Sequence, residues 1–190
     1  MTVLLSGKAS GRAPAVLLRP WRRTDLPALL DAHRDERMRR TLVNSLTDEQ
    51  SGGQWLAAQI AGWSTSTRFG FAVLAEDIGA EPIGHLSITS GADPTTEAVS
   101  SAESAEVGYW VAAKARGRGI ASRALDIATD WAFSSRCDLP LTRLELLHSV
   151  DNHASCRVAG NCGYLLHSIL PPEPPMFPAE GHRHVREQYN

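Results

Sequence analysis

The chain has 190 residues, of which 43% are hydrophobic and 21% are charged, and its formal net charge is −2. This near balance provides no overall basic field of the kind that attracts nucleic acid or an acidic membrane. The length fits one domain with a sizeable core. The 3 cysteines are too few for a disulfide framework, and no apolar run approaches a membrane span or a signal sequence. We therefore expect a cytoplasmic protein with no nucleic-acid or membrane partner.

The first residues are small, polar and glycine-bearing, which predicts a flexible leader over 1–14 and one folded domain over 15–190. Apolar periodicity and capping residues then predict the first half of the domain. We expect a strand over Ala15–Trp21, a helix capped by Thr24-Asp25, a helical turn over Asp35–Arg40, a helix opened by the capping box Thr47–Gln50, strands over Phe69–Ala75 and Pro82–Thr89, and an exposed loop over Ser90–Ala105. In the second helix, Trp55, Leu56, Ile60 and Trp63 fall at helical spacing.

The most informative stretch is Glu106–Phe133. Its first residues, 106–112, alternate in the manner of a half-buried strand, and residues 120–131 repeat apolar side chains with a period of about 3.6, as an amphipathic helix does. A basic, glycine-rich turn, Arg116-Gly117-Arg118-Gly119, lies between them. The stretch therefore predicts a strand, a short turn and a helix.

The second half of the chain continues with alternating elements. We expect a strand over Pro140–Val150, a short helix capped by Asp151-Asn152 and ended by Gly163, a strand over Tyr164–Ile169, an extended proline-rich loop over Pro171–Pro178, and a last edge strand over His182–Tyr189. The prolines exclude that loop from the interior of a sheet.

The turn Arg116–Gly119 has the chemistry of an anion site. The first amides of a helix have no partner inside the helix, and the helix dipole adds positive potential there. Two glycines let the backbone curl around an anion, and two arginines add mobile charge. A Walker loop is excluded because Ile120-Ala121 follows where Lys-Ser/Thr is needed, and a lone Gly-x-Gly is weak support for a dinucleotide fingerprint.

The pattern Arg116-x-x-Gly119-x-Ala121 resembles the (Arg/Gln)-x-x-Gly-x-(Gly/Ala) signature of the GNAT superfamily of N-acetyltransferases. A second block, Leu144–Ala159, has Asn152-x-x-Ser155 at the start of a helix and is closed by Gly163-Tyr164. This second block resembles the corresponding conserved block in the ribosomal-protein N-acetyltransferase (RimJ/RimL-type) branch of that superfamily. The two blocks occur in the expected order, so the resemblance covers about Leu17 to Tyr164 in element order.

The resemblance implies an α/β (α+β) fold in a single domain. Its mixed, strongly twisted sheet would have about six or seven strands, flanked by about four helices. The fourth and fifth strands, here Glu106–Ala112 and Leu141–Ser149, would splay apart like a V. The pantetheine of acetyl-CoA would lie in the splay, and the pyrophosphate would bind the basic turn. The implied coenzyme-binding residues are Trp110, Val111, Ala112, Arg116, Gly117, Arg118, Gly119, Ile120, Ala121, Ser122, Asn152 and Ser155.

Two residues are our candidates for catalysis. Glu106 lies on the strand that would line the splay, and the family often places a carboxylate there as a base; a solvent-facing strand-edge charge is an equal alternative. Many members carry a tyrosine on the helix after the second block, but Ala159 occupies that position. Ser155 is then the hydroxyl best placed to assist the leaving thiolate, unless it only bonds backbone near the helix start.

No metal is expected. His182-x-His184 would put two imidazoles on one face of a strand, but no third ligand is evident in the sequence. None of the cysteines has a nucleophile's partner nearby in sequence, which favours direct attack of the amine on the thioester.

The sequence thus predicts an acetyl-CoA-dependent N-acetyltransferase, as a monomer or a homodimer. Its partners would be acetyl-CoA and an amine acceptor: a protein N-terminus, an antibiotic, a polyamine or an amino acid. A non-catalytic acyl-CoA-binding or regulatory protein on the same fold is the leading alternative, and a nucleotide-binding α/β protein is a weaker one.

Overall fold

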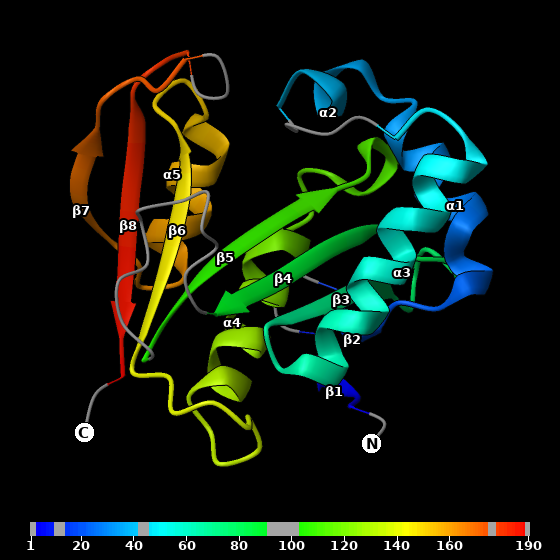
Figure 1. Cartoon of the computed structure of the whole chain (residues 1–190), viewed down its shortest axis with the longest axis horizontal. Helices are drawn as coiled ribbons and strands as arrows, with labels where there is room; N and C mark the ends of the chain where they lie inside the picture. The colour runs from blue at the N-terminus through cyan, green and yellow to red at the C-terminus, as the bar shows by residue number, and fades with distance from the viewer. Residues whose placement is uncertain (1–2, 10–13, 42–45, 91–102, 175–177, 189–190) are drawn as a thin grey trace. The chain divides into compact units, whose positions relative to one another are not determined.

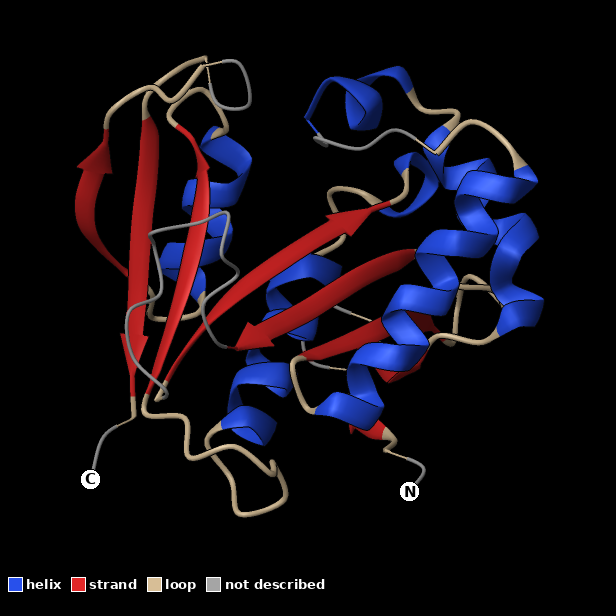
Figure 2. Cartoon of the chain, in the orientation of Figure 1, coloured by secondary structure: helices blue, strands red, loops and turns tan. Residues whose placement is uncertain are grey.

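The computed structural model describes residues 3–9, 14–41, 46–90, 103–174 and 178–188. Within these ranges there are eight strands, five α-helices and two short 3-10 helices (Figures 1 and 2). The strands form one mixed sheet in the order β1-β2-β3-β4-β5-β6-β8-β7. The predicted α/β class is therefore confirmed, with slightly more strands and helices than expected. The chain groups into two compact units, Met1–Ser87 with Tyr109–Ala128 and Ile88–Gly108 with Thr129–Asn190, which we call the first unit and the second unit.

The first three strands of the chain lie in the first unit and pair in an antiparallel manner. β1 (Leu5–Gly7) pairs with β2 (Val16–Pro20), which pairs with β3 (Arg68–Ala75). Every residue of β3 after the first is buried, because both faces of this apolar run are covered. β4 (Gly84–Ser90) follows. We expected a flexible leader over 1–14, but Leu5 is buried and its strand pairs with β2. A run of three residues is too short to indicate such a long-range pairing in the sequence.

The helices of the first unit are α1 (Leu26–His33), α2 (Glu36–Thr41) and α3 (Glu49–Thr65), and α1 follows the 3-10 turn η1 (Arg23–Asp25). The capping box of α3 is shifted by one residue from the prediction: the Asp48 side chain accepts from the Ser51 amide at 2.8 Å. Leu56 is buried as expected, but Ile60 is exposed and Gln59 is buried instead.

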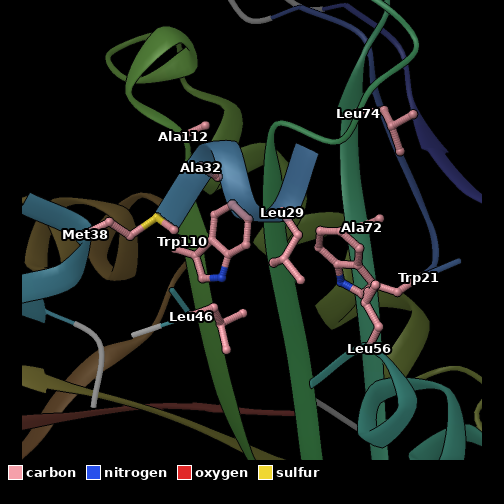
Figure 3. Packing of buried hydrophobic residues seen from close by; sticks show 10 residues of the cluster. All are labelled: Trp21, Leu29, Ala32, Met38, Leu46, Leu56, Ala72, Leu74, Trp110 and Ala112. Atoms are coloured by element: carbon pink, nitrogen blue, oxygen red, sulfur yellow. The ribbon is translucent and has the colours of Figure 1, made fainter. Parts of the chain in front are cut away.

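The core of the first unit is rich in tryptophan. The Trp21 ring lies 5.3 Å from Trp55 and 6.2 Å from Trp110, and the Trp110 ring lies 5.7 Å from His33. Figure 3 shows the buried cluster around them: Trp21, Leu29, Ala32, Met38, Leu46, Leu56, Ala72, Leu74, Trp110 and Ala112. These residues come from strands and helices far apart in the sequence, so the cluster fixes where the end of β5 lies in this unit.

The sheet of the second unit combines one parallel ladder with two antiparallel ladders. β5 (Ser104–Val111) pairs in parallel with β6 (Arg143–Ser149) over Ser104–Val107 and Arg143–Leu146. The helix of this unit is α5 (His153–Asn161), whereas η2 (Ala113–Ala115) and most of α4 (Ile120–Ala132) belong to the first unit. Both β5 and β6 continue beyond the paired residues of this ladder.

The last two strands correct one prediction. β8 (Gly181–Glu187) pairs with both β6 and β7 (Leu165–Leu170), so it is an inner strand and not an edge strand (Figure 1). β7, with Leu165, Leu166 and Ile169 exposed, forms the edge. The predicted loops over Ser90–Ala105 and Pro171–Pro178 lie partly outside the described residues. None of the helices in the described ranges has the length and apolarity needed to cross a bilayer.

Candidate active site

The glycine-rich turn adopts the backbone conformation of an anion cradle. Gly117 and Gly119 both have φ of 74°, in the left-handed region that side chains with a Cβ rarely adopt. α4 begins immediately afterwards at Ile120. Left-handed residues in front of a helix turn several N–H groups toward one side, and the first amides of the helix add to them. The turn therefore has both backbone features that bind phosphate.

The two arginines of this turn differ in their contacts. The Arg116 guanidinium donates to the Val111 carbonyl at 3.0 Å and to the Asp35 carboxylate at 2.6 Å. Its hydrogen bond and that of the Met38 amide lower the pKa of the Asp35 carboxyl. Arg116 is thus tied to the end of β5 and to the segment before α2, which differs from the mobile charge expected of it. Arg118 pairs with Asp77 at the surface, where both side chains remain well exposed.

The residues on either side of the turn are mostly packed within the first unit. Trp110 belongs to the core cluster, and Ile120 is buried. The Ala112 amide donates to the Ile83 carbonyl at 2.8 Å, so this predicted ligand-binding residue already has a backbone partner. Ala121 and Ser122 are half-buried in the first turn of α4. Their contacts with coenzyme remain a prediction.

In the second unit, Asn152 is the N-cap of α5. Its side-chain oxygen accepts from the Ser155 amide at 3.2 Å, and Ser155 is buried at the third position of the helix. The capping role predicted for Asn152 is confirmed, and the cap holds Ser155 in one place. The role of either residue toward coenzyme or thiolate stays a prediction.

Glu106 lies opposite Glu145 in the parallel ladder and is half-buried. The sequence reasoning did not single out Glu145, a buried carboxylate that pairs with Arg143 at 2.8 Å and with Arg183 at 3.4 Å. Since side chains alternate along β6, this ion-pair face is opposite to the face of His148, which α5 covers. Glu106 and Ser155 therefore lie on opposite faces of the second unit's sheet.

A second cluster was also missed. The donor atoms of His148, Cys156, His182 and His184 all lie within 4.8 Å of one another. The sequence showed only the pair on β8, because His148 and Cys156 are 34 and 26 residues away from His182 along the chain, and only folding brings them beside it. The structure thus brings two further side chains with donor atoms, His148 and Cys156, beside His182 and His184.

A family model described as "Acetyltransferase (GNAT) domain" matches residues 15–165. The chain belongs to the GNAT acetyltransferase family. The matched segment includes the turn Arg116–Gly119 and the capped start of α5, so both motifs read from the sequence lie inside this GNAT domain. A search of curated proteins found no match.

Solved structures share the fold at low sequence identity. RimJ of Mycobacterium smegmatis, solved with a CoA disulfide, has a TM-score of 0.78 at 21% identity, with 96% of this chain and 86% of that one covered. RimL, a ribosomal alpha-N-protein acetyltransferase, has a TM-score of 0.77 at 18% identity, covering 99% and 96%. The microcin self-immunity acetyltransferase MccE, solved with acetyl-CoA and AMP, has a TM-score of 0.74 at 14% identity, covering 91% and 92%. This GNAT protein therefore shares its fold with RimJ/RimL-type proteins.

Proposed function

We propose that this GNAT protein transfers the acetyl group of acetyl-CoA to a primary amine by direct attack on the thioester. The observation that carries the proposal is the turn before α4, where Gly117 and Gly119 are both left-handed inside the segment that matches the family. This backbone suits a pyrophosphate, and two of the structural neighbours were solved with CoA or acetyl-CoA. Arg118, which is exposed, would exchange Asp77 for phosphate, while Arg116 would hold the turn in shape.

The chemistry requires a base, because an α-amine has a reference pKa of about 8 and a lysine amine of about 10.4. We assign this role to Glu106, acting directly or through a water. A backbone amide near Trp110 or Val111 would stabilise the developing oxyanion. Ser155, held by the Asn152 cap, would stabilise or protonate the leaving thiolate.

The acceptor is proposed only as a class. A protein N-terminus and a small-molecule amine both fit the reaction, and the ribosomal alpha-N-protein acetyltransferase RimL among the structural neighbours favours the former. The alternative is a non-catalytic acyl-CoA-binding protein. Release of free CoA thiol in the presence of a panel of peptides and small amines distinguishes the two, because a binder releases no thiol with any acceptor.

The coenzyme loop is tested with Gly119→Val. A Cβ and a branched side chain at φ 74° should distort the turn and lower coenzyme affinity, measured by calorimetry. Gly163→Val is the matched control, because Gly163 has φ of 71° at the end of α5 and suffers the same strain in the other unit. Arg118→Ala should show a milder and salt-sensitive loss. Unchanged coenzyme binding by folded Gly119→Val would disprove the loop assignment.

The catalytic residues are tested with Glu106→Gln and Ser155→Ala. Each should lower kcat by about 10²–10⁴-fold while coenzyme affinity stays nearly constant. Glu106→Gln should also remove the acidic limb of the pH–rate profile. Glu103→Gln, an exposed carboxylate just before β5, should leave both quantities unchanged. If both variants retain wild-type turnover on a true acceptor, these residue roles fail while the family assignment stands.

A further inference from the structure

His148, Cys156, His182 and His184 form a cluster that lies wholly within the second unit, although these residues are far apart in the sequence. His148 on β6 is directly opposite His182 on β8, and His184 follows two residues later on the same face. α5 covers that face and contributes Cys156. The imidazole rings are 5.1–5.8 Å apart. One thiol and three imidazoles thus converge from three different elements.

Backbone carbonyls orient two of the three rings. Nδ1 of His148 lies 2.8 Å from the Ser149 carbonyl, and Nδ1 of His184 lies 3.3 Å from the Tyr164 carbonyl. A carbonyl accepts only, so each Nδ1 carries the proton and each Nε2 keeps its lone pair. This is the arrangement by which proteins orient histidines that ligate metals.

The lone pair on His184 has no protein partner. Nε2 of His184 is buried and makes no hydrogen bond. A buried polar atom without a partner costs free energy and calls for an explanation. A bound cation would provide one, since it accepts the lone pair in place of a hydrogen-bond donor.

The distances between the donor atoms also fit a tetrahedral metal site. With metal–nitrogen bonds of about 2.0–2.1 Å and a metal–sulfur bond of about 2.3 Å, tetrahedral ligand atoms stand about 3.3–3.6 Å apart. The Cys156 sulfur is 3.3 Å from Nδ1 of His182 and 3.7 Å from Nε2 of His148. Since all donor atoms lie within 4.8 Å of one another, side-chain adjustments of about 1 Å would close the remaining edges.

We propose that His148, Cys156, His182 and His184 bind one zinc-type divalent ion. Thiolate and imidazole are the donors that zinc prefers, and four protein ligands make a closed, structural site rather than a catalytic one. On binding, the Cys156 thiol releases its proton to solvent and its sulfur joins the metal. The ion would fasten α5 to β6 and β8, and with it the capped turn of Asn152 and Ser155.

A different use of the same atoms is a cysteine nucleophile activated by His182. That reading needs one imidazole beside the sulfur and gives no role to the second and third rings or to the buried Nε2 of His184. The four-donor set therefore favours the metal. The two readings make opposite predictions for an acetyl group on Cys156.

The test is titration of the full-length, chelator-treated protein with cobalt(II), followed by displacement with zinc. We expect one equivalent of cobalt to give the visible bands of a tetrahedral ion and a thiolate-to-cobalt charge-transfer band. Cys156→Ser should abolish the charge-transfer band, and His182→Ala should weaken affinity at least about tenfold. His167→Ala, an exposed histidine on β7 outside the cluster, should bind as the parent does. Zinc should raise the Tm of the parent and of His167→Ala, but not that of Cys156→Ser.

Several results would overturn the proposal. One is the absence of stoichiometric cobalt binding, and another is an octahedral spectrum that survives Cys156→Ser. An acetyl adduct on Cys156, found by intact mass after incubation with acetyl-CoA, would assign the sulfur to covalent chemistry instead. Because cobalt binding and Tm need no acceptor amine, failure of the metal site and failure of the proposed acetyl transfer are separately visible.

Discussion

His85 is a titratable side chain that lies buried in the core of the first unit. Its Nδ1 accepts a hydrogen bond from the Trp21 indole at 2.9 Å, and its ring lies 5.0 Å from that of Trp55. Burial lowers the pKa of His85 from 6.5 to about 3, against a smaller opposing effect of a backbone hydrogen bond with Phe71. The ring is therefore neutral in the folded protein, and the Trp21 hydrogen bond fixes the tautomer with the proton on Nε2.

This shift makes stability depend on pH. Between pH 6.5 and about 3 the unfolded chain binds a proton at His85 that the folded protein does not, so the free energy of unfolding falls as the pH is lowered. The slope from one such group approaches about 1.4 kcal/mol per pH unit. We expect urea midpoints to drop from pH 7 to pH 5, and His85→Gln, which keeps an acceptor for Trp21, to reduce the drop. An identical pH dependence in the variant would refute the assignment to His85.

At the scale of elements, one ion pair joins β2 to the start of α1. The Arg19 guanidinium on β2 binds both carboxylate oxygens of Asp25 at 2.7 and 2.8 Å, and both side chains are buried. Asp25 also accepts from the Arg22 amide at 2.8 Å. The sequence predicted Asp25 as a helix cap, but its side chain makes no capping bond to α1, because its oxygens are occupied by Arg19 and Arg22.

Asp25→Ala should lower the free energy of unfolding by about 3–5 kcal/mol, because it leaves the Arg19 charge buried and unpaired. Asp31→Ala removes the partner of Arg34 in an exposed pair at 3.5 Å and should cost less than about 1 kcal/mol. The double variant Arg19→Met, Asp25→Ala should be more stable than Asp25→Ala alone, as judged by urea unfolding. A single variant no worse than the Asp31 control would show that the buried pair is not needed.

At the scale of the whole molecule, the strands differ in how they are enclosed. β3 lies between β2 and β4 and is buried along nearly its whole length. Within the described residues, β7 is an edge strand that pairs with β8 only and exposes most of its side chains. An edge strand can separate from its one neighbour without disturbing a core, whereas an enclosed strand is freed only by unfolding.

Native-state hydrogen exchange should therefore rank the strands. Amides of β3 should exchange only through global unfolding, with a strong dependence on denaturant, and amides of β7 should exchange through local opening with little dependence. Amides of β8, although close to the end of the chain, should be better protected than those of β7 because β8 has a neighbour on each side. Faster exchange in β8 than in β7 would contradict this strand order.

Much of the fold was determined by the sequence through short-range patterns. The apolar run of β3, the helical spacing of α4 and the cap at Asn152 each involve residues within one or two turns, so their signals survive in a single sequence. The turn Arg116–Gly119 was recognisable for the same reason, because two glycines directly before a helix indicate a left-handed backbone from local sequence alone.

Only the tertiary structure decided the features that join distant residues. The partner of Arg116 is Asp35, which is 81 positions away, and β8 takes an inner place because it pairs with both β6 and β7. The four possible metal ligands come from β6, α5 and β8. Local periodicity states which face a side chain occupies on its own element, but not which element covers that face. Strand order and the covering helix, which depend on burial across the whole unit, determined that these imidazoles meet a cysteine.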